Sequence, residues 1–148
     1  MSANAPIRVF VSHLFTKDAD YLRFFEFLES MDRFFYLNCS NPDKNPGGGL
    51  EAMKEELLSQ IKEAEAVVII AQHFTENPEL VSYQLDVADA NQKPVLVLRP
   101  FGGVVETPPV LAERGQEVLT WNEREIADAL RRHARLEDTS RWDVIDFP

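Results

Sequence analysis

The fold is decided by Ala66-Val67-Val68-Ile69-Ile70-Ala71, a run of six consecutive apolar residues near the middle of the chain. A short run that is apolar at every position is typical of a parallel β-strand buried on both faces. Parallel strands are joined by long crossover connections, which are usually helices. We therefore expect strands and helices to alternate on both sides of this run.

The sequence on either side of the run shows this alternation. Short β-branched or aromatic runs predict four more strands, at residues 8–12, 34–38, 94–99 and 117–121. Apolar spacing and capping residues predict helices at residues 18–30, 50–61 and 78–90, and a last helix capped by Asn122. Five strands separated by helices predict an α/β fold with right-handed crossovers. The expected architecture is a flavodoxin-like three-layer sandwich with a five-stranded parallel sheet in the order 2-1-3-4-5.

The chain is 148 residues long, which fits one domain with a single core. No internal repeat and no long linker divides it. We expect one domain over residues 1–148, with a core from about 7 to 136 and a tail over 137–148. The tail contains Trp142, Ile145 and Phe147, which we expect either to pack back onto the domain or to meet a partner.

Charge and cysteine content exclude several partners and environments. Lys and Arg total 15 and Asp and Glu total 25, so the formal charge is −10. Such an acidic surface repels phosphate backbones, and no nucleic-acid partner is expected. The single cysteine, Cys39, fits a reducing cytosol, and no apolar stretch of about 18 residues predicts a membrane span. The first residues lack the basic and apolar regions of a signal peptide, so we expect a cytoplasmic protein.

In a parallel sheet of this order, ligands bind outside the carboxyl ends of the strands, near the point where the strand order reverses. Four segments are expected at that edge, at residues 12–15, 40–49, 72–75 and 99–102. We therefore expect the functional residues to lie in these segments.

Several chemistries that are common in such folds lack their residues here. The three histidines lie far apart in sequence and Cys39 has no partner motif, so no metal site is expected. Gly47-Gly48-Gly49 is not followed by the Lys-Ser/Thr of a P-loop, and the G-x-G-x-x-G fingerprint is missing. Ala71-Gln72 stand where a phospho-acceptor receiver would need an aspartate. No cofactor is expected.

Four parts of the chain, in this order, resemble those of Toll/interleukin-1 receptor (TIR) domains. Val9-Phe10-Val11-Ser12-His13 resembles the first-strand signature of the family, and residues 41–49 lie where the family has a long variable loop. Residues 71–75 and 80–88 are similar to the segment that leads from the third strand into the next helix. Arg99-Pro100-Phe101-Gly102 is similar to a turn of the bacterial subgroup, which includes the stand-alone TIR proteins of the Thoeris antiphage system.

The resemblance covers roughly residues 7–134 and implies an enzyme that cleaves the nicotinamide–ribose bond of NAD⁺. NAD⁺ would be its substrate rather than a cofactor. NADase or ADP-ribosyl cyclase activity would then produce an ADP-ribose-derived signal in bacterial antiviral defence, and a separate effector protein would read that diffusible signal. Active sites in the family are often completed by a neighbouring protomer, so the resemblance also implies self-association.

Gln84 stands at the position of the family's catalytic glutamate. In the family, that carboxylate stabilises the cationic ribosyl centre that forms when nicotinamide departs. An amide keeps the shape of the side chain and loses the charge, which at about 4 Å is worth about 4 kcal/mol, or about a thousandfold in rate. We therefore expect a catalytically disabled form of the enzyme, in which Gln84→Glu restores nicotinamide release.

Two other functions remain open at this point. One is a non-catalytic TIR adaptor that assembles through loop 40–49 and its helix faces, and the other is a nucleoside deoxyribosyltransferase-like enzyme on the same fold. Helical spacing places Val81 and Leu85 on the stripe that faces the sheet, with Gln84 at its margin and its amide directed toward the carboxyl edge. The same placement suits a boundary residue that is hydrogen-bonded to a loop.

The remaining candidate substrate-binding residues are Ser12, His13, Phe15, Phe74, Leu80 and Arg99. His13 and Phe15 would flank a nicotinamide or adenine ring, and Arg99 would hold a pyrophosphate with two hydrogen bonds. Each also has a structural interpretation: Ser12 can end its strand through a backbone bond, and Arg99 can pair with a surface carboxylate. Leu80 replaces an aromatic residue that is usual in the family, which weakens any stacking at that position.

Overall fold

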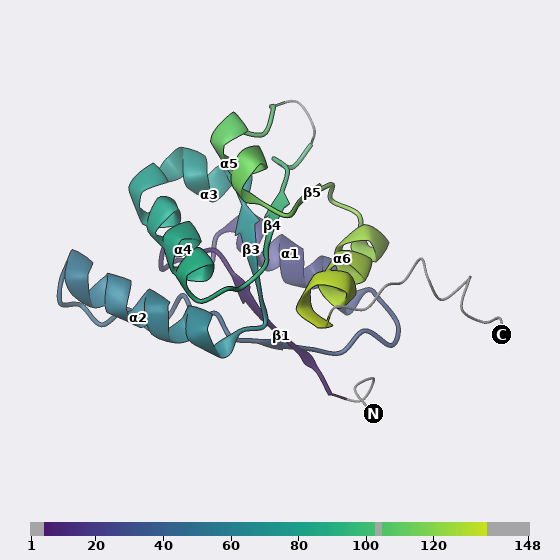
Figure 1. The fold of residues 1–148 in the computed structure, drawn as a ribbon, viewed down its shortest axis with the longest axis horizontal. Helices are drawn as coiled ribbons and strands as arrows, with labels where there is room; N and C mark the ends of the chain where they lie inside the picture. Colours follow the sequence, from purple (N-terminus) through teal and green to yellow (C-terminus); the bar gives the residue numbers. More distant parts are fainter. Residues whose placement is uncertain (1–4, 103–104, 136–148) are drawn as a thin grey trace, which may run out of the picture.

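The computed structural model describes residues 5–102 and 105–135. The strands are β1 (Ile7–Val11), β2 (Tyr36–Asn38), β3 (Ala66–Ile70), β4 (Val95–Leu98) and β5 (Glu117–Leu119). The helices are α1 (Ala19–Glu29), α2 (Leu50–Glu63), α3 (Ala71–Glu76), α4 (Pro78–Ala90), α5 (Pro109–Arg114) and α6 (Glu123–Arg135). Figure 1 shows these elements along the chain.

The strands form one parallel sheet in the order β2-β1-β3-β4-β5. This order confirms the predicted α/β, flavodoxin-like fold. All five residues of β3 are buried, as the continuous apolar run predicts for a central parallel strand.

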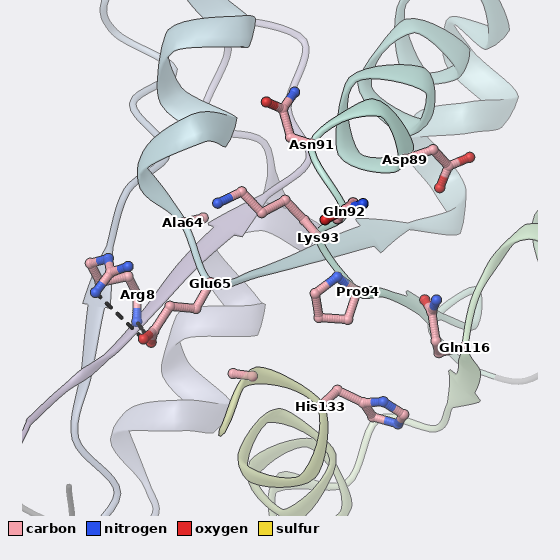
Figure 2. A pocket seen from close by; sticks show the side chains of 11 residues that line it. Arg8, Ala64, Glu65, Asp89, Asn91, Gln92, Lys93, Pro94, Gln116 and His133 are labelled. Atoms are coloured by element: carbon pink, nitrogen blue, oxygen red, sulfur yellow. Dashed lines mark hydrogen bonds and ion pairs between the residues drawn. The ribbon is translucent and has the colours of Figure 1, made fainter. Parts of the chain in front are cut away.

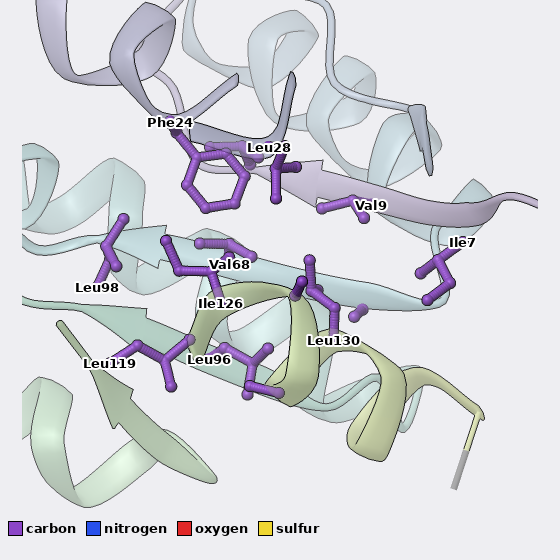
Figure 3. Close-up of a cluster of buried hydrophobic side chains, with 14 of the residues drawn as sticks. Ile7, Val9, Phe24, Leu28, Val68, Leu96, Leu98, Leu119, Ile126 and Leu130 are labelled. Atoms are coloured by element: carbon purple, nitrogen blue, oxygen red, sulfur yellow. The ribbon is translucent and has the colours of Figure 1, made fainter. Parts of the chain in front are cut away.

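Helices cover both faces of the sheet. In Figure 1, α1 and α6 lie on one side of it, and α2, α3, α4 and α5 lie on the other. Alternate residues of β3 serve the two faces, so that Val68 belongs to one apolar cluster and Val67 to the other. Figure 3 shows the first cluster, in which Phe24 of α1 and Leu130 of α6 lie over the sheet.

Capping residues fix two helix starts as the sequence predicts. The Asp18 side chain accepts a hydrogen bond from the Tyr21 N–H at 2.9 Å and caps α1. The Asn122 side chain accepts one from the Glu125 N–H at 2.9 Å, at the start of α6. The predicted caps are therefore confirmed at both helices.

Several predicted boundaries are wrong. β1 ends at Val11 rather than residue 12, β4 ends at Leu98 rather than residue 99, and β2 and β5 have three residues each. Residues 72–75 follow the third strand as predicted, and they lie in a helix that the sequence analysis does not expect, α3, which continues directly from β3. The stretch around Pro108-Pro109 contains α5, because proline suits the first turn of a helix, where its missing N–H is not needed.

The tail over residues 137–148, with Trp142, Ile145 and Phe147, lies outside the described residues. Within residues 5–102 and 105–135, no helix is both long enough and apolar enough to cross a membrane.

Candidate functional site

Buried polar side chains gather at the carboxyl edge of the sheet, where β1 and β3 end. Ser12 and His13 follow β1, His73 lies in α3 directly after β3, and Gln84 lies in α4. All four residues are completely buried. We call them the edge cluster, and their hydrogen bonds decide what this edge can do, since buried polar groups need partners.

Ser12 and His73 form a hydrogen-bonded chain with Asp18. The Ser12 Oγ accepts the Ile70 N–H at 2.9 Å and lies 2.8 Å from Nδ1 of His73. The Nε2 atom of His73 lies 2.8 Å from a carboxylate oxygen of Asp18, the residue that caps α1. Nucleophilic hydrolases use a Ser–His–Asp chain, but here the hydroxyl is buried and engaged by the backbone. In this conformation the Ser12–His73–Asp18 hydrogen bonds connect the end of β1 to α3 and to the start of α1.

The hydrogen bonds of His13 define its protonation. Its Nδ1 accepts the Phe15 N–H at 3.1 Å, so in the neutral ring Nε2 carries the proton and donates to the Gln60 Oε1 at 2.9 Å. Burial lowers the pKa of His13 from 6.5 to about 4, although the bond to Gln60 opposes this effect. His13 is therefore neutral at physiological pH, and its ring supports the loop from inside rather than lining an open surface.

Gln84 faces the loop after β1, but it is completely buried rather than at the margin of the helix stripe that the sequence predicts. Its Nε2 donates to the backbone carbonyl of His13 at 2.9 Å. Its Oε1 is buried and has no hydrogen-bond partner among the described residues. The loop that carries His13 lies against this amide, which explains the difference in burial.

Gln60 of α2 belongs to this network, and it is not among the site residues predicted from the sequence. Its Oε1 accepts both the His13 ring N–H and the Asn41 N–H, each at 2.9 Å, and its Nε2 donates to the Asn41 carbonyl at 3.2 Å. Gln60 thereby joins the loop after β1 to the loop after β2. The sequence contains one indication of this role. Gln60 lies beside Ile61 on the apolar stripe of the helix, and a polar residue on such a stripe needs a hydrogen-bond partner.

The structure divides the remaining predicted residues between the two faces of the sheet. Phe15, Phe74 and Leu80 pack into the apolar cluster of α2 and α4, with Leu80 fully inside it. Arg99 follows β4 and is exposed, and it lines a cleft with Trp121, which packs against the cluster of α1 and α6. Arg99 therefore does not belong to the edge cluster.

A larger hollow lies at the opposite, amino edge of the sheet, with a volume of about 600 Å³. Figure 2 shows Arg8, Glu65, Lys93 and His133 around it, with Arg8 and Glu65 joined by an ion pair of 3.4 Å. Charges of both signs line this hollow, and it contains none of the predicted site residues. Within the described ranges, no group of three or more His, Cys, Asp or Glu residues could hold a metal ion.

Comparisons with known proteins add little to this geometry. No family model matches the chain, and no curated protein matches it. A crystal structure of a 3-dehydroquinate dehydratase-like protein from Bifidobacterium longum is similar, with 16% sequence identity over 88% of this chain and 96% of that chain. The TM-score is 0.46, and a likeness at this level carries no argument about function.

Proposed function

We propose that this chain is a TIR-type domain of bacterial antiviral defence that acts by assembly rather than by turning over NAD⁺. The observation that carries the proposal is the hydrogen bond from the completely buried Gln84 amide to the His13 carbonyl. The resemblance of the sequence to TIR domains supplies the family and the defence setting.

The direction of this hydrogen bond opposes catalysis at position 84. A catalytic carboxylate would have to face a ribosyl cation with its negative charge. Gln84 instead donates an N–H to a backbone acceptor, a bond that an ionised carboxylate cannot make. The amide therefore has a structural role here, which supports a domain without the chemical step.

The outer edge of β2, with which no strand of residues 5–102 and 105–135 pairs, supports assembly. β2 is the outermost strand, and the Phe35 carbonyl and the Cys39 N–H pair with β1. Parallel pairing therefore directs the backbone groups of Tyr36 and Asn38 away from the sheet. The Phe35 and Leu37 side chains are 55% and 53% exposed. An outermost strand that carries exposed apolar side chains favours pairing with another chain, and two copies related by a two-fold axis would extend the sheet.

We expect the protein to dimerise as its concentration rises, and Leu37→Asp to weaken the dimer by about tenfold or more, because it adds a charge to this edge. Light scattering coupled to size-exclusion chromatography measures the mass. Val110→Asp is the matched control, since Val110 is 46% exposed on α5, away from β2. Salt should strengthen the dimer by screening the repulsion between two acidic copies, and NAD⁺ should leave it unchanged. A protein that stays monomeric at every salt and protein concentration contradicts assembly through β2.

A second candidate function is the disabled NAD⁺ glycohydrolase or cyclase that the resemblance implies. It is favoured by the Gln84 Oε1, a buried acceptor at the carboxyl edge of the sheet that has no hydrogen-bond partner in the described part of the chain. A buried acceptor without a partner needs an explanation, and a ligand donor would supply one only if the loop after β1 moved to admit it.

Chromatography of nicotinamide separates the two candidates. We expect no release from NAD⁺ by the wild-type protein, because no carboxylate stands at position 84. Assembly without catalysis predicts that Gln84→Glu is also silent, whereas a disabled enzyme predicts release by this variant. Near-UV circular dichroism at the assay temperature verifies that the variant is folded. Release by the wild-type protein would overturn both proposals.

A further inference from the structure

A small cleft lies beside Arg99 and Trp121, where β4 and β5 end. Its volume is about 220 Å³, and its walls are Arg99, Pro100, Gly102, Thr120 and Trp121. The Arg99 N–H donates to the Leu119 carbonyl at 3.0 Å, and the Trp121 indole N–H donates to the Arg99 carbonyl at 2.7 Å. These two bonds fix the indole and the arginine backbone relative to each other.

The Arg99 guanidinium is exposed and has no hydrogen-bond or ion-pair partner within residues 5–102 and 105–135. Most arginines of the described chain do have a carboxylate partner: Arg8, Arg23, Arg114, Arg131, Arg132 and Arg135. With 25 acidic residues against 15 basic ones, an arginine in a cleft without a carboxylate is available for an anion.

Aromatic rings make one side of this region rigid. The Trp121 ring packs edge-on against Phe27 and Phe101, at centroid distances of 5.4 and 5.3 Å. The Arg23 guanidinium lies 3.9 Å from the centroid of the Phe101 ring, and Asp20 counters its charge. Trp121 is therefore held in place by neighbours on α1 and in the loop after β4.

We propose that this cleft binds a nucleoside monophosphate or a ligand of the same chemistry, a flat ring that carries a phosphate. Arg99 would hold the phosphate through two parallel N–H···O bonds. Trp121 would offer its indole to the ring of the ligand, since base–aromatic stacking contributes about 1–3 kcal/mol. The inference does not rest on the proposed function, because Gln84 lies in α4, on the other side of the sheet from the cluster that holds Trp121.

Tryptophan fluorescence tests the proposal with AMP as the probe. The chain has two tryptophans, so the background variant Trp142→Phe leaves Trp121 as its one indole. We expect AMP to quench this indole saturably at concentrations below about 1 mM, and adenosine and inorganic phosphate each to bind at least about tenfold more weakly, because each lacks one half of the recognised chemistry.

The Arg99→Gln variant should weaken AMP binding by about tenfold or more, because a bidentate charged contact is lost. Arg33→Gln is the matched control: it removes the same charge from an exposed residue of the loop between α1 and β2. Equal affinity of Arg99→Gln and the wild-type protein for AMP would overturn the proposal, as would the absence of saturable quenching. If inorganic phosphate binds as tightly as AMP, the proposal that the cleft recognises the ring of the ligand is wrong. Nicotinamide release does not enter this test, so the two proposals can fail separately.

Discussion

Lowering the pH from 7.5 to 5 should reduce the free energy of unfolding by about 2 kcal/mol through His13 alone. Burial lowers the pKa of His13 to about 4 in the folded protein, while the unfolded chain has the ordinary value of 6.5. Below pH 6.5 the unfolded state therefore binds a proton that the folded state does not bind, and stability falls. The loss approaches about 3 kcal/mol as the pH reaches 4, at about 1.4 kcal/mol for each pKa unit between the two values.

The hydrogen bonds of His13 give this effect a structural cause. Protonation places a second N–H on the ring at Nδ1, which now accepts the Phe15 N–H. Two donors would then face each other, and the ring would carry a charge in a buried site. Protonation of His13 in the folded protein is therefore unfavourable, which agrees with the direction of its pKa shift.

Urea unfolding at a series of pH values measures this loss in the wild-type protein and in His13→Asn. The variant cannot titrate at this position, so the stability difference between the two proteins should shrink by about 2 kcal/mol between pH 7.5 and 5. An NMR titration of the His13 ring is independent of the variants, and a midpoint near 6.5 would show the prediction to be wrong.

The fold could be predicted from the sequence because its signals are local and strong. The six-residue apolar run identifies the central strand, and Asp18 and Asn122 mark helix starts through hydrogen bonds that span three residues. The helix α3 could not be predicted in the same way. It has six residues and follows β3 without a break, so it is too short to show a helical period.

The sequence predicts where the edge cluster lies, but it does not predict which side chains are hydrogen-bonded to each other. Sequence position puts Ser12 and His13 at the end of β1, and this is where they lie. Their partners come from distant segments: His73 lies 61 residues after Ser12, and Gln60 lies 47 residues after His13. No local pattern connects such pairs, because the crossover helices decide which side chains meet.

One-residue differences in strand ends also matter for Arg99. The sequence places it in the fourth strand, whereas the structure ends that strand at Leu98. Alternation along the strand would place Arg99 on the same face as Val97, which belongs to the cluster of α2 and α4. Because Arg99 lies after the end of the strand, it does not follow that alternation, and it lines the cleft beside Trp121 instead.

The Gln84→Glu variant should lose about 4 kcal/mol of unfolding free energy at pH 8. The new carboxylate would lie in a completely buried site and would face the His13 carbonyl, an acceptor, in place of the N–H that now donates to it. Leaving an uncompensated charge in the interior costs about 3–5 kcal/mol. Urea unfolding measures the difference from the wild-type protein. Gln92→Glu is the matched control, because it adds the same charge at an exposed position two residues after the end of α4.

The pH dependence of this variant separates a charge effect from a lost hydrogen bond. Burial should raise the pKa of the new carboxyl, and once protonated it can donate to the His13 carbonyl. The deficit of Gln84→Glu relative to the wild-type protein should therefore shrink as the pH falls from 8 toward 5, the opposite sense to the effect of His13. Gln84→Met has no donor and no charge, so its deficit of about 1–3 kcal/mol should stay constant with pH. A Gln84→Glu protein as stable as the wild-type protein at pH 8 would mean that this site accepts a carboxylate, and it would favour the disabled enzyme over assembly without catalysis.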